Sequence, residues 1–482
     1  MSWFKKVIDK LRSRLIGGAA LLSILTLGSY ITGLMRDRIF AHTFGAGREL
    51  DIYNAAFIIP DLLLVTFVAS ALSPAFIPLF SGLNAQEKKK EADEFASSVI
   101  ISAVGIMLIL GILAALLMPF LSGVVAPGFD EAERALLTKT SRLLLLSPLI
   151  IALSTAVGSM LVSYKSFLSY GLSPIFYNAG IIGGTYLVPS FGLYGLIIGT
   201  LGGALLHLAP RLISIARTPF NFSWKLKIKE HNFHTMLRLM LPKMLGHPVE
   251  QLKFLGFTRV ATLLTAGSVT SISFARNFQS VPVSLFGIAT SVAAFPLLAE
   301  YAAKNDRTAY LETFFKALRT ILYLTIPSAI GLYLLSELPI RIFLGGGNFT
   351  ETDIIRTGSV LAIFSLAIPT EGLLHLLARS FYALKNTLIP VTMRLVGLGI
   401  SLGFAYTQYG TMGIVAVPYG FVLGSIFEVG GLSLILRRHL ATSGGELSYD
   451  HARLNPPAKP IPEEQAPAEA DATTPEGYGG HQ

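Results

Sequence analysis

Residues 97–121 read SSVIISAVGIMLILGILAALLMPFL, and none of these positions carries a charge. A helix needs about 20 apolar residues to cross the roughly 30 Å hydrocarbon core of a bilayer. The composition of the whole chain agrees, since 52% of its 482 residues are hydrophobic and only 14% are charged. Soluble domains carry about 25% charged residues. We therefore expect a protein that lies largely within a membrane.

Similar hydrophobic stretches recur along the chain, separated by polar loops. We interpret the pattern as an all-α integral membrane protein with about 12 transmembrane helices, since each stretch is long enough for one crossing. The first stretch lacks a small-residue cleavage pattern, which favours a retained span over a removed signal peptide. The expected spans lie near residues 17–41, 53–80, 97–121, 138–162, 168–189, 193–215, 236–264, 269–298, 317–338, 355–381, 387–407 and 412–436.

Basic residues fall on one side of this arrangement. They precede the first span and follow every second span, whereas the opposite loops at 128–133 and 345–353 are Gly-rich or acidic. The positive-inside rule makes the basic side cytoplasmic, so both termini are expected in the cytoplasm. The basic loop residues are Lys5, Lys6, Lys10, Arg12, Arg14, Lys88, Lys89, Lys90, Lys165, Arg217, Lys225, Lys227, Lys229, Lys304, Arg307, Lys385, Arg437 and Arg438.

An internal repeat divides the chain into two halves. The offset between the halves covers six spans, and because six is even, both halves cross the membrane in the same direction. Parallel repeats of this kind pair into two six-helix lobes around a central cavity, where substrates bind near the membrane midplane. Chance placement of prolines and glycines is the alternative. The paired landmarks, 216 to 221 residues apart, are Pro78 with Pro296, Gly128 with Gly347, Pro148 with Pro369, Lys165 with Lys385, and Pro174 with Pro390.

The repeat and the loop composition give the expected domains. Residues 217–235 combine lysines with apolar residues and should lie on the cytoplasmic membrane surface. The chain after residue 443 is rich in Pro, Ala and Glu without apolar periodicity, which is typical of disorder. The predicted division is a basic N-terminus (1–16), a first lobe (17–215), a basic amphipathic linker (216–235), a second lobe (236–438) and an acidic, Pro-rich cytoplasmic tail (439–482).

Charged residues inside the expected spans are the candidate site residues. A charge at membrane depth costs at least a few kcal/mol, so each should face a partner or a water-filled cavity. The alternative for the first-span cluster is an interfacial position at the outer end of that span. The candidates are Arg36, Asp37 and Arg38 in span 1, Lys253 and Arg259 in span 7, and Arg276 in span 8.

Two further groups of polar residues lie on helical stripes. Pro248 interrupts the first stripe and can open a hinge there, because proline has no backbone N–H. Together the charged candidates are cationic, which suits an anionic ligand such as a pyrophosphate, whose oxygens accept bidentate bonds from arginine. The stripes consist of Lys243, His247 and Glu250 in span 7, and of Glu371, His375 and Arg379 in span 10.

Several functional classes find no support in the sequence. The chain has no cysteine, which excludes disulfides, thiol catalysis and Cys-ligated metal sites. It contains no G-x-x-x-x-G-K-[ST] phosphate loop, no paired catalytic carboxylates, no Ser/His/Asp arrangement and no metal-ligand spacing. The net charge of +9 does not indicate nucleic-acid binding, because the basic residues are scattered between hydrophobic spans. We predict a transporter rather than an enzyme, with no cofactor and no metal.

A series of short motifs runs along both halves of the chain: GLMRDRIFA (33–41), FGAG (44–47) with Asp51, PDLL (60–63), ALSPAFIP (71–78), AGSV (266–269), FAR (274–276) with Pro282, and FPL (295–297). With these motifs the chain resembles the MurJ/MviN family over roughly residues 15–440. The resemblance implies a lipid II flippase of the multidrug/oligosaccharidyl-lipid/polysaccharide exporter superfamily, in the bacterial cytoplasmic membrane. Such a protein moves a lipid-linked peptidoglycan precursor by alternating access.

The resemblance also implies roles for individual residues. Arg36 and Arg276 match arginines that the family uses for the lipid-linked pyrophosphate, and Asp37 and Asp51 match acidic positions of the same motif. The chain departs from the family pattern at several positions. Two further family arginines fall at Tyr30 and Leu64, and an acidic residue falls at Ala275. The acidic and amide residues that the family associates with cation binding in span 11 are missing, with Arg394 nearby instead. Arg38, Lys253 or Arg259 could replace the lost positive charge.

Two other interpretations remain at this point. One is an exporter of another polyprenyl-linked glycan or of drugs. The other is a membrane scaffold that does not transport and instead recruits cell-wall synthesis proteins through its loops and tail. The lost arginines favour the scaffold, whereas the remaining charges within the membrane argue against it. The expected partners are undecaprenyl-pyrophosphate-linked saccharide, membrane lipids and possible cell-wall synthesis proteins.

Overall fold

The computed structural model describes residues 18–69, 72–246 and 248–442. Within these ranges the regular elements are helices, apart from a single bridge between Gly346 and Phe349 in one loop. The predicted N-terminus (1–16), His247 and nearly all of the predicted tail lie outside the described residues. The all-α fold class is confirmed.

The described residues of the first half form ten helices and one π-helical turn. Each expected span coincides with one helix or with a short series of helices. The elements are α2 (Gly18–Phe44), α3 (Arg48–Ala56), α4 (Ile58–Leu64), the π-helix η1 (Val65–Ala69), α5 (Leu72–Ala85), α6 (Lys89–Val125), α7 (Glu131–Leu144), α8 (Leu146–Ser163), α9 (Phe167–Thr185), α10 (Val188–Phe191) and α11 (Leu193–Ile215).

The second half repeats this order. Its last helix runs four residues into the region predicted as the tail, which was predicted to begin at residue 439. The elements are α12 (His231–Gly246), α13 (Pro248–Thr262), α14 (Ser268–Pro282), the π-helix η2 (Val283–Ile288), α15 (Ala289–Ala303), α16 (Arg307–Leu334), α17 (Glu337–Phe343), α18 (Glu351–Ser365), α19 (Ile368–Ala383), α20 (Leu388–Met412), the 3-10 turn η3 (Gly413–Val415) and α21 (Ala416–Thr442).

The number of membrane crossings stays a prediction. By length and apolar composition alone, seven helical stretches of the described residues are able to cross a membrane, or eight if α18 and α19, bent by 43°, count as one. One of the seven, Leu388–Ala441, contains both α20 and α21. These two helices are antiparallel, because Gly420 approaches Ser401 closely while Gly431 approaches Met393.

Unusual backbone features recur at the repeat distance. The π-helices η1 and η2 begin 218 residues apart, at Val65 and Val283. Left-handed residues are also paired, Glu87 with Asn305 and Lys165 with Lys385, and so are two further glycines, Gly192 and Gly413. Helices α7 and α18 both begin with a capping box. Backbone features of this kind are imposed by local geometry, so their recurrence supports two copies of one six-span unit.

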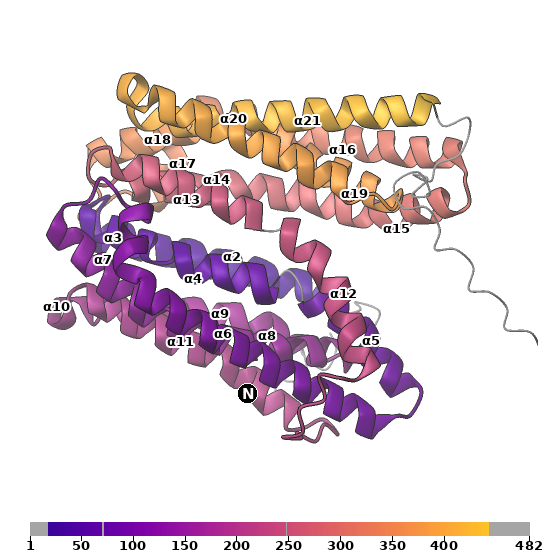
Figure 1. Cartoon of the computed structure of the whole chain (residues 1–482). Coiled ribbons are helices and arrows are strands. Elements are labelled where there is room, and N and C mark those ends of the chain that lie inside the picture. Colours follow the sequence, from indigo (N-terminus) through magenta and orange to yellow (C-terminus); the bar gives the residue numbers. More distant parts are fainter. Residues whose placement is uncertain (1–17, 70–71, 247, 443–482) are drawn as a thin grey trace, which may run out of the picture.

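The two copies run in the same direction. In Figure 1, α5 and its counterpart α15 lie at one end of the molecule, while α7 and its counterpart α18 lie at the other. We call the end with the loops before α7 and α18 the acidic-loop end, because Asp130, Glu131 and Glu351 lie there. The opposite end, which carries Lys88, Lys165 and the linker after α11, is the basic-loop end. The parallel two-lobed fold is confirmed.

Close helix contact within the first lobe depends on glycine. Gly180 and Gly184 on α9 lie against Gly203 and Gly199 on α11, and a Cβ atom on any of them would clash with the backbone opposite. Glycines four residues apart lie on one face of a helix and allow such close approach in membrane proteins. The glycine pairs thus allow α9 to pack tightly against α11, and this packing positions α9 beside the cavity.

Helix α12 packs against the first lobe, although most of its residues lie within the predicted second lobe (236–438). Its side chains Phe233, Met236 and Met240 are buried in a cluster with Phe76 and Phe80 of α5. The next helix, α13, packs against α20 of the second lobe. The boundary of the second lobe predicted at residue 236 therefore differs from this packing, in which residues up to 246 belong with the first lobe.

Candidate functional site

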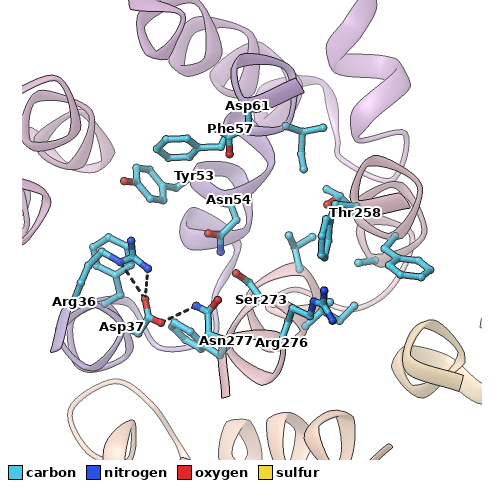
Figure 2. A pocket seen from close by; sticks show the side chains of 18 of the residues that line it. Arg36, Asp37, Tyr53, Asn54, Phe57, Asp61, Thr258, Ser273, Arg276 and Asn277 are labelled. Carbon is cyan, nitrogen blue, oxygen red and sulfur yellow. Dashed lines mark hydrogen bonds and ion pairs between the residues drawn. The ribbon is translucent and has the colours of Figure 1, made fainter. Parts of the chain in front are cut away.

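A cavity of about 460 Å³ lies between the two lobes. Helices α2, α3, α4 and α9 of the first lobe form one side, and α13 and α14 of the second lobe form the other (Figure 2). The position agrees with the central cavity expected from a parallel repeat. Much of the wall is aromatic: Phe40, Tyr53, Phe57, Tyr177, Phe254, Phe257 and Phe274.

Arg36 enters the cavity from α2. Its Nε and Nη2 atoms donate to Oδ1 of Asp37 at 3.1 and 2.8 Å, and its Nη1 donates to Oδ1 of Asn178 at 3.1 Å. Asn178 lies on α9, which the glycine contacts hold against the rest of the lobe. The guanidinium is therefore fixed in place while its side chain remains partly open to the cavity, with 26% of its surface exposed.

Arg276 enters from the other side, on α14. Its Nη1 donates to Glu371 at 2.9 Å and to Gln279 at 2.8 Å, and its Nη2 lies 3.4 Å from Glu250. The guanidinium also lies 4.6 Å from the ring centroid of Phe421. This arginine is thus held by two carboxylates and an aromatic face inside the second lobe.

A hydrogen bond connects the two arginine sites across the cavity. Nδ2 of Asn277, the residue after Arg276, donates to Oδ2 of Asp37 at 2.7 Å. Asp37 therefore accepts from Arg36 of its own lobe and from Asn277 of the other lobe at the same time. Figure 2 shows this chain from Arg36 through Asp37 to Asn277 along one side of the cavity.

The charge of the cavity differs from the cationic site that we expected. The lining contains two arginines, Arg36 and Arg276, and two aspartates, Asp37 and Asp61, so its formal charges balance. Each arginine is also engaged by a carboxylate. The sequence shows which charges lie in the expected spans. It does not show which helices meet, and therefore not which charges form ion pairs.

Asp51 does not line the cavity and instead joins the lobes at the acidic-loop end. Its fully buried carboxylate accepts from the backbone N–H groups of Gly267 and Thr270 at 2.7 and 2.8 Å, and from the Thr270 hydroxyl at 2.8 Å. Gly267 precedes α14 and has no side chain to cap that helix. Asp51 of the first lobe supplies the cap from outside, with its negative charge at the positive end of the helix dipole.

Arg38, Lys253 and Arg259 also lie outside the cavity lining. Arg38 donates to the backbone oxygens of Ile342 and Phe343 at 2.9 and 3.0 Å. Arg259 donates to the backbone oxygen of Val124 at 2.8 Å. The structure therefore brings together three of the seven predicted site residues, namely Arg36, Asp37 and Arg276.

Lys253 extends the charge network behind Arg276. Its side chain is buried, lies 3.3 Å from Glu250 and has its Nζ atom 5.0 Å from the ring centroid of Phe421. Arg394, the other basic residue noted near this region, lies 3.6 Å from Glu428. These residues belong to the interior of the second lobe. The seventh-span stripe contributes Glu250 to this network, while His247 lies outside the described residues.

Several polar residues of the site were not selected from the sequence, among them Asp61, Asn178 and Asn277. Asp61 and Asn178 lie in otherwise apolar runs, so the cost argument that identified Arg36 applies to them as well. Asn277 follows Arg276 directly, and its amide beside a candidate arginine is the feature of the sequence that could have identified it as a site residue.

The lobes are closely joined at the acidic-loop end. The backbone N–H of Asn348 donates to the His42 oxygen at 3.0 Å, and the Asn348 amide donates to the Thr43 oxygen at 2.7 Å. Gly45 and Gly267, both with positive φ, are so close to the opposite lobe that a Cβ atom would clash with its backbone. The FGAG and AGSV motifs thus place glycines where the two lobes meet.

Comparison with known protein families gives a match over most of the chain. The family model described as lipid II flippase MurJ matches residues 40–454. A probable lipid II flippase MurJ of Thermotoga maritima is 29% identical over 414 residues, covering 84% of this chain and 83% of that protein. The lipid II flippase MurJ of Thermosipho africanus is 31% identical over 416 residues, again covering 84% and 83%.

Solved structures agree. A lipid II flippase MurJ in an inward closed conformation superposes with a TM-score of 0.75 at 28% identity, covering 86% of this chain and 87% of that one. An inward-facing multidrug transporter of the MATE family superposes with a TM-score of 0.72 over 86% of this chain and 94% of that one. At 15% identity the second likeness concerns the fold alone.

Proposed function

We propose that this chain, which belongs to the MurJ family of lipid II flippases, holds the diphosphate of lipid II between Arg36 and Arg276 while the headgroup crosses the membrane. The family resemblance predicted from the motifs is confirmed, and the chain is a transporter rather than an enzyme. The comparisons do not favour the exporter or scaffold alternatives. The roles of individual residues are the part that we propose here.

The observation that carries the proposal is that two arginines from different lobes line one cavity. A diphosphate has enough oxygens to accept bidentate bonds from both guanidinium groups. Arginine is suited to this because its planar fork matches phosphate geometry and remains charged. A ligand held by both lobes can respond to their relative movement, which alternating access requires.

The diphosphate competes with protein carboxylates for these arginines. In the described state Arg36 is bound to Asp37 and Arg276 to Glu371. A diphosphate that replaces Asp37 on Arg36 also releases the Asp37 side chain. Asp37 is then no longer held in the position in which it accepts the hydrogen bond from Asn277. Ligand binding is thereby linked to the contact between the lobes, because one aspartate takes part in both.

The basic-loop end is the cytoplasmic end, with both termini inside the cell. The positive-inside rule supports this orientation. The joined lobes at the acidic-loop end then close the outer face, so the contacts of Asp51 and Asn348 must break before the headgroup can leave outward. A bacterial inner membrane follows from the family, while the side assignment is a proposal.

The position of the linker after α11 indicates where the membrane–water interface lies at the basic-loop end. The N–H groups of its Ser223 and Lys227 donate to the hydroxyls of Ser97 and Ser98 on α6, each at 2.9 Å. The apolar run of α6 begins directly after Ser98, so these serines mark the edge of the hydrocarbon. Trp224, 85% exposed, lies between the two contacts and suits the interface.

Binding of lipid II to purified variants tests the arginine site. Loss of a charge-assisted contact in Arg36→Ala or Arg276→Ala should cost roughly 1.5–3 kcal/mol, which weakens binding by about 10- to 100-fold. Lysine at either position should also weaken binding, because it lacks the fork. Arg38→Ala is the matched control, since Arg38 lies two residues from Arg36 and outside the cavity. Unchanged affinity in both cavity variants, with melting temperatures close to that of the parent protein, would refute the shared site.

A further inference from the structure

Asp61 is a charged residue of the cavity lining that has no role in the proposed diphosphate site. It lies on α4 and lines the cavity, yet its carboxylate has no hydrogen-bond or ion-pair partner among the described residues. Figure 2 places it across the cavity from Arg36, Asp37 and Asn277. An unpaired carboxylate at membrane depth is costly, so its presence needs a reason.

The protein itself does not supply a cation to Asp61. On its own helix series the residues one turn away are apolar: Phe57 and Ile58 before it, and Leu64 and Val65 after it. The other charged residues of the lining are Arg36, Asp37 and Arg276, and both arginines are held by other carboxylates. Asp61 is therefore the carboxylate of the lining that lacks a counter-charge within the described residues.

The walls near the middle of the cavity suit a cation. Phe57, one turn before Asp61, packs edge to face against Tyr53 with ring centroids 5.0 Å apart, and Tyr177 and Phe254 also line the cavity. Aromatic faces attract ammonium groups through the quadrupole of the ring, most strongly where water is excluded. A carboxylate among aromatic side chains is a combination that recognises an organic ammonium.

We propose that Asp61 binds an ammonium group on the headgroup of the transported lipid. The inference rests on the proposed function, because the diphosphate of the same headgroup occupies Arg36 and Arg276. The substrate class is then a polyprenyl-diphosphate glycopeptide whose peptide carries a free side-chain amine. The headgroup is held as a zwitterion, with its anionic end at the arginines and its cationic end at Asp61.

A cycle of two ligands and two proteins isolates this contact. The ligands are lipid II with a lysine in its peptide stem and the same molecule with the lysine amine acetylated. The proteins are the full chain and its Asp61→Asn variant, which keeps the shape of the side chain. Coupling between ligand and residue appears as non-additivity of the two changes.

The expected result is a loss of about tenfold in affinity when the amine is acetylated, the size of one charge-assisted contact, seen only with Asp61 present. In Asp61→Asn the two ligands should bind within about twofold of each other. Equal effects of acetylation on both proteins overturn the inference. Asp61→Glu keeps the carboxylate and should retain a preference for the free amine, and loss of that preference also counts against the inference.

The Arg276→Ala variant separates this inference from the proposed function. If Arg276→Ala weakens both ligands while acetylation has no effect on the parent protein, the diphosphate site stands and the ammonium site fails. If Arg276→Ala and Arg36→Ala both leave the affinity for the two ligands unchanged, the proposed function fails, and the inference falls with it.

Discussion

Two aspartates hold the lobes together, and they do so in different ways. Asp51, at the acidic-loop end, is fully buried and accepts from backbone N–H groups at the start of α14. Asp37, at the cavity, accepts from the side chains of Arg36 and Asn277. Backbone donors of a helix end cannot turn away, whereas side chains can exchange partners. The comparison indicates a closure that opens only when the lobes separate at one site, and a contact that a ligand can replace at the other.

The largest expected effect is at Asp51. Asp51→Ala removes the cap of α14 and leaves buried N–H groups without an acceptor, which should lower the free energy of unfolding by roughly 3–5 kcal/mol. The measurement is the melting temperature of the purified protein in detergent. Asp130→Ala is the control: Asp130 is an exposed N-cap at the same end, and its loss should cost about 0.5–2 kcal/mol. Equal destabilisation by both variants would show that the contact between lobes adds nothing.

The cavity contact should affect binding rather than stability. Asp37→Asn replaces the carboxylate that competes for Arg36 by a neutral amide, so the affinity for lipid II should rise. The rise should be about 2- to 10-fold if the amide keeps a neutral hydrogen bond to Arg36 and only the extra strength of the charge-assisted bond, about 0.5–1.5 kcal/mol, is lost. Isothermal titration with lipid II measures this change. Asp306→Asn serves as the matched control, because Asp306 is an exposed N-cap of α16, outside both the cavity lining and the junction of the lobes. A fall in affinity for Asp37→Asn would mean that Asp37 supports binding instead of opposing it.

Asn277 should have a smaller effect. Asn277→Ala removes one neutral hydrogen bond between the lobes and leaves both arginines in place, so stability should fall by about 0.5–1.5 kcal/mol. The affinity for lipid II should change by less than about threefold, since no ligand contact is lost. Melting temperature and titration on the same sample give both values. A loss of binding as large as that of Arg276→Ala would assign Asn277 to the ligand site itself.

The smallest effect concerns the linker, remote from both aspartates. The chain has two tryptophans, so Trp3→Phe leaves Trp224 as the single fluorophore. In nanodiscs made with brominated lipids its emission should be quenched, because the side chain lies at the membrane interface. Lipid II affinity should stay within about twofold in the Trp224→Ala variant, since no ligand contact is removed. Emission typical of water, without quenching, would place the linker away from the bilayer.

Much of the fold follows from patterns that the sequence makes visible. Apolar runs such as 97–121 give the helices, and the recurrence of Pro78 at Pro296 gives the repeat, because both depend on local composition. The packing of α12 against the first lobe is not visible in this way. Phe233 and Met236 are apolar on either lobe, and only the fold determines which of the two buries them.

The site was harder to predict for a related reason. A charge within a span shows that a polar environment exists, but not where it lies. Arg36 and Arg38 are neighbours in sequence, yet residues two apart on a helix point to opposite sides. Arg36 consequently faces the cavity, and Arg38 faces the C-terminal end of α17. Asp51 was selected by the same motif and lies at the junction of the lobes.

The most direct test measures the distance between the lobes at the acidic-loop end while lipid II binds in the cavity. Because the chain has no cysteine, spin labels at Ala132→Cys and Thr352→Cys report the distance between the lobes there without background. The account predicts that lipid II lengthens this distance in part of the population, and that Arg276→Ala abolishes the response. An unchanged distance distribution in protein that demonstrably binds lipid II would contradict the link between the cavity and the junction of the lobes.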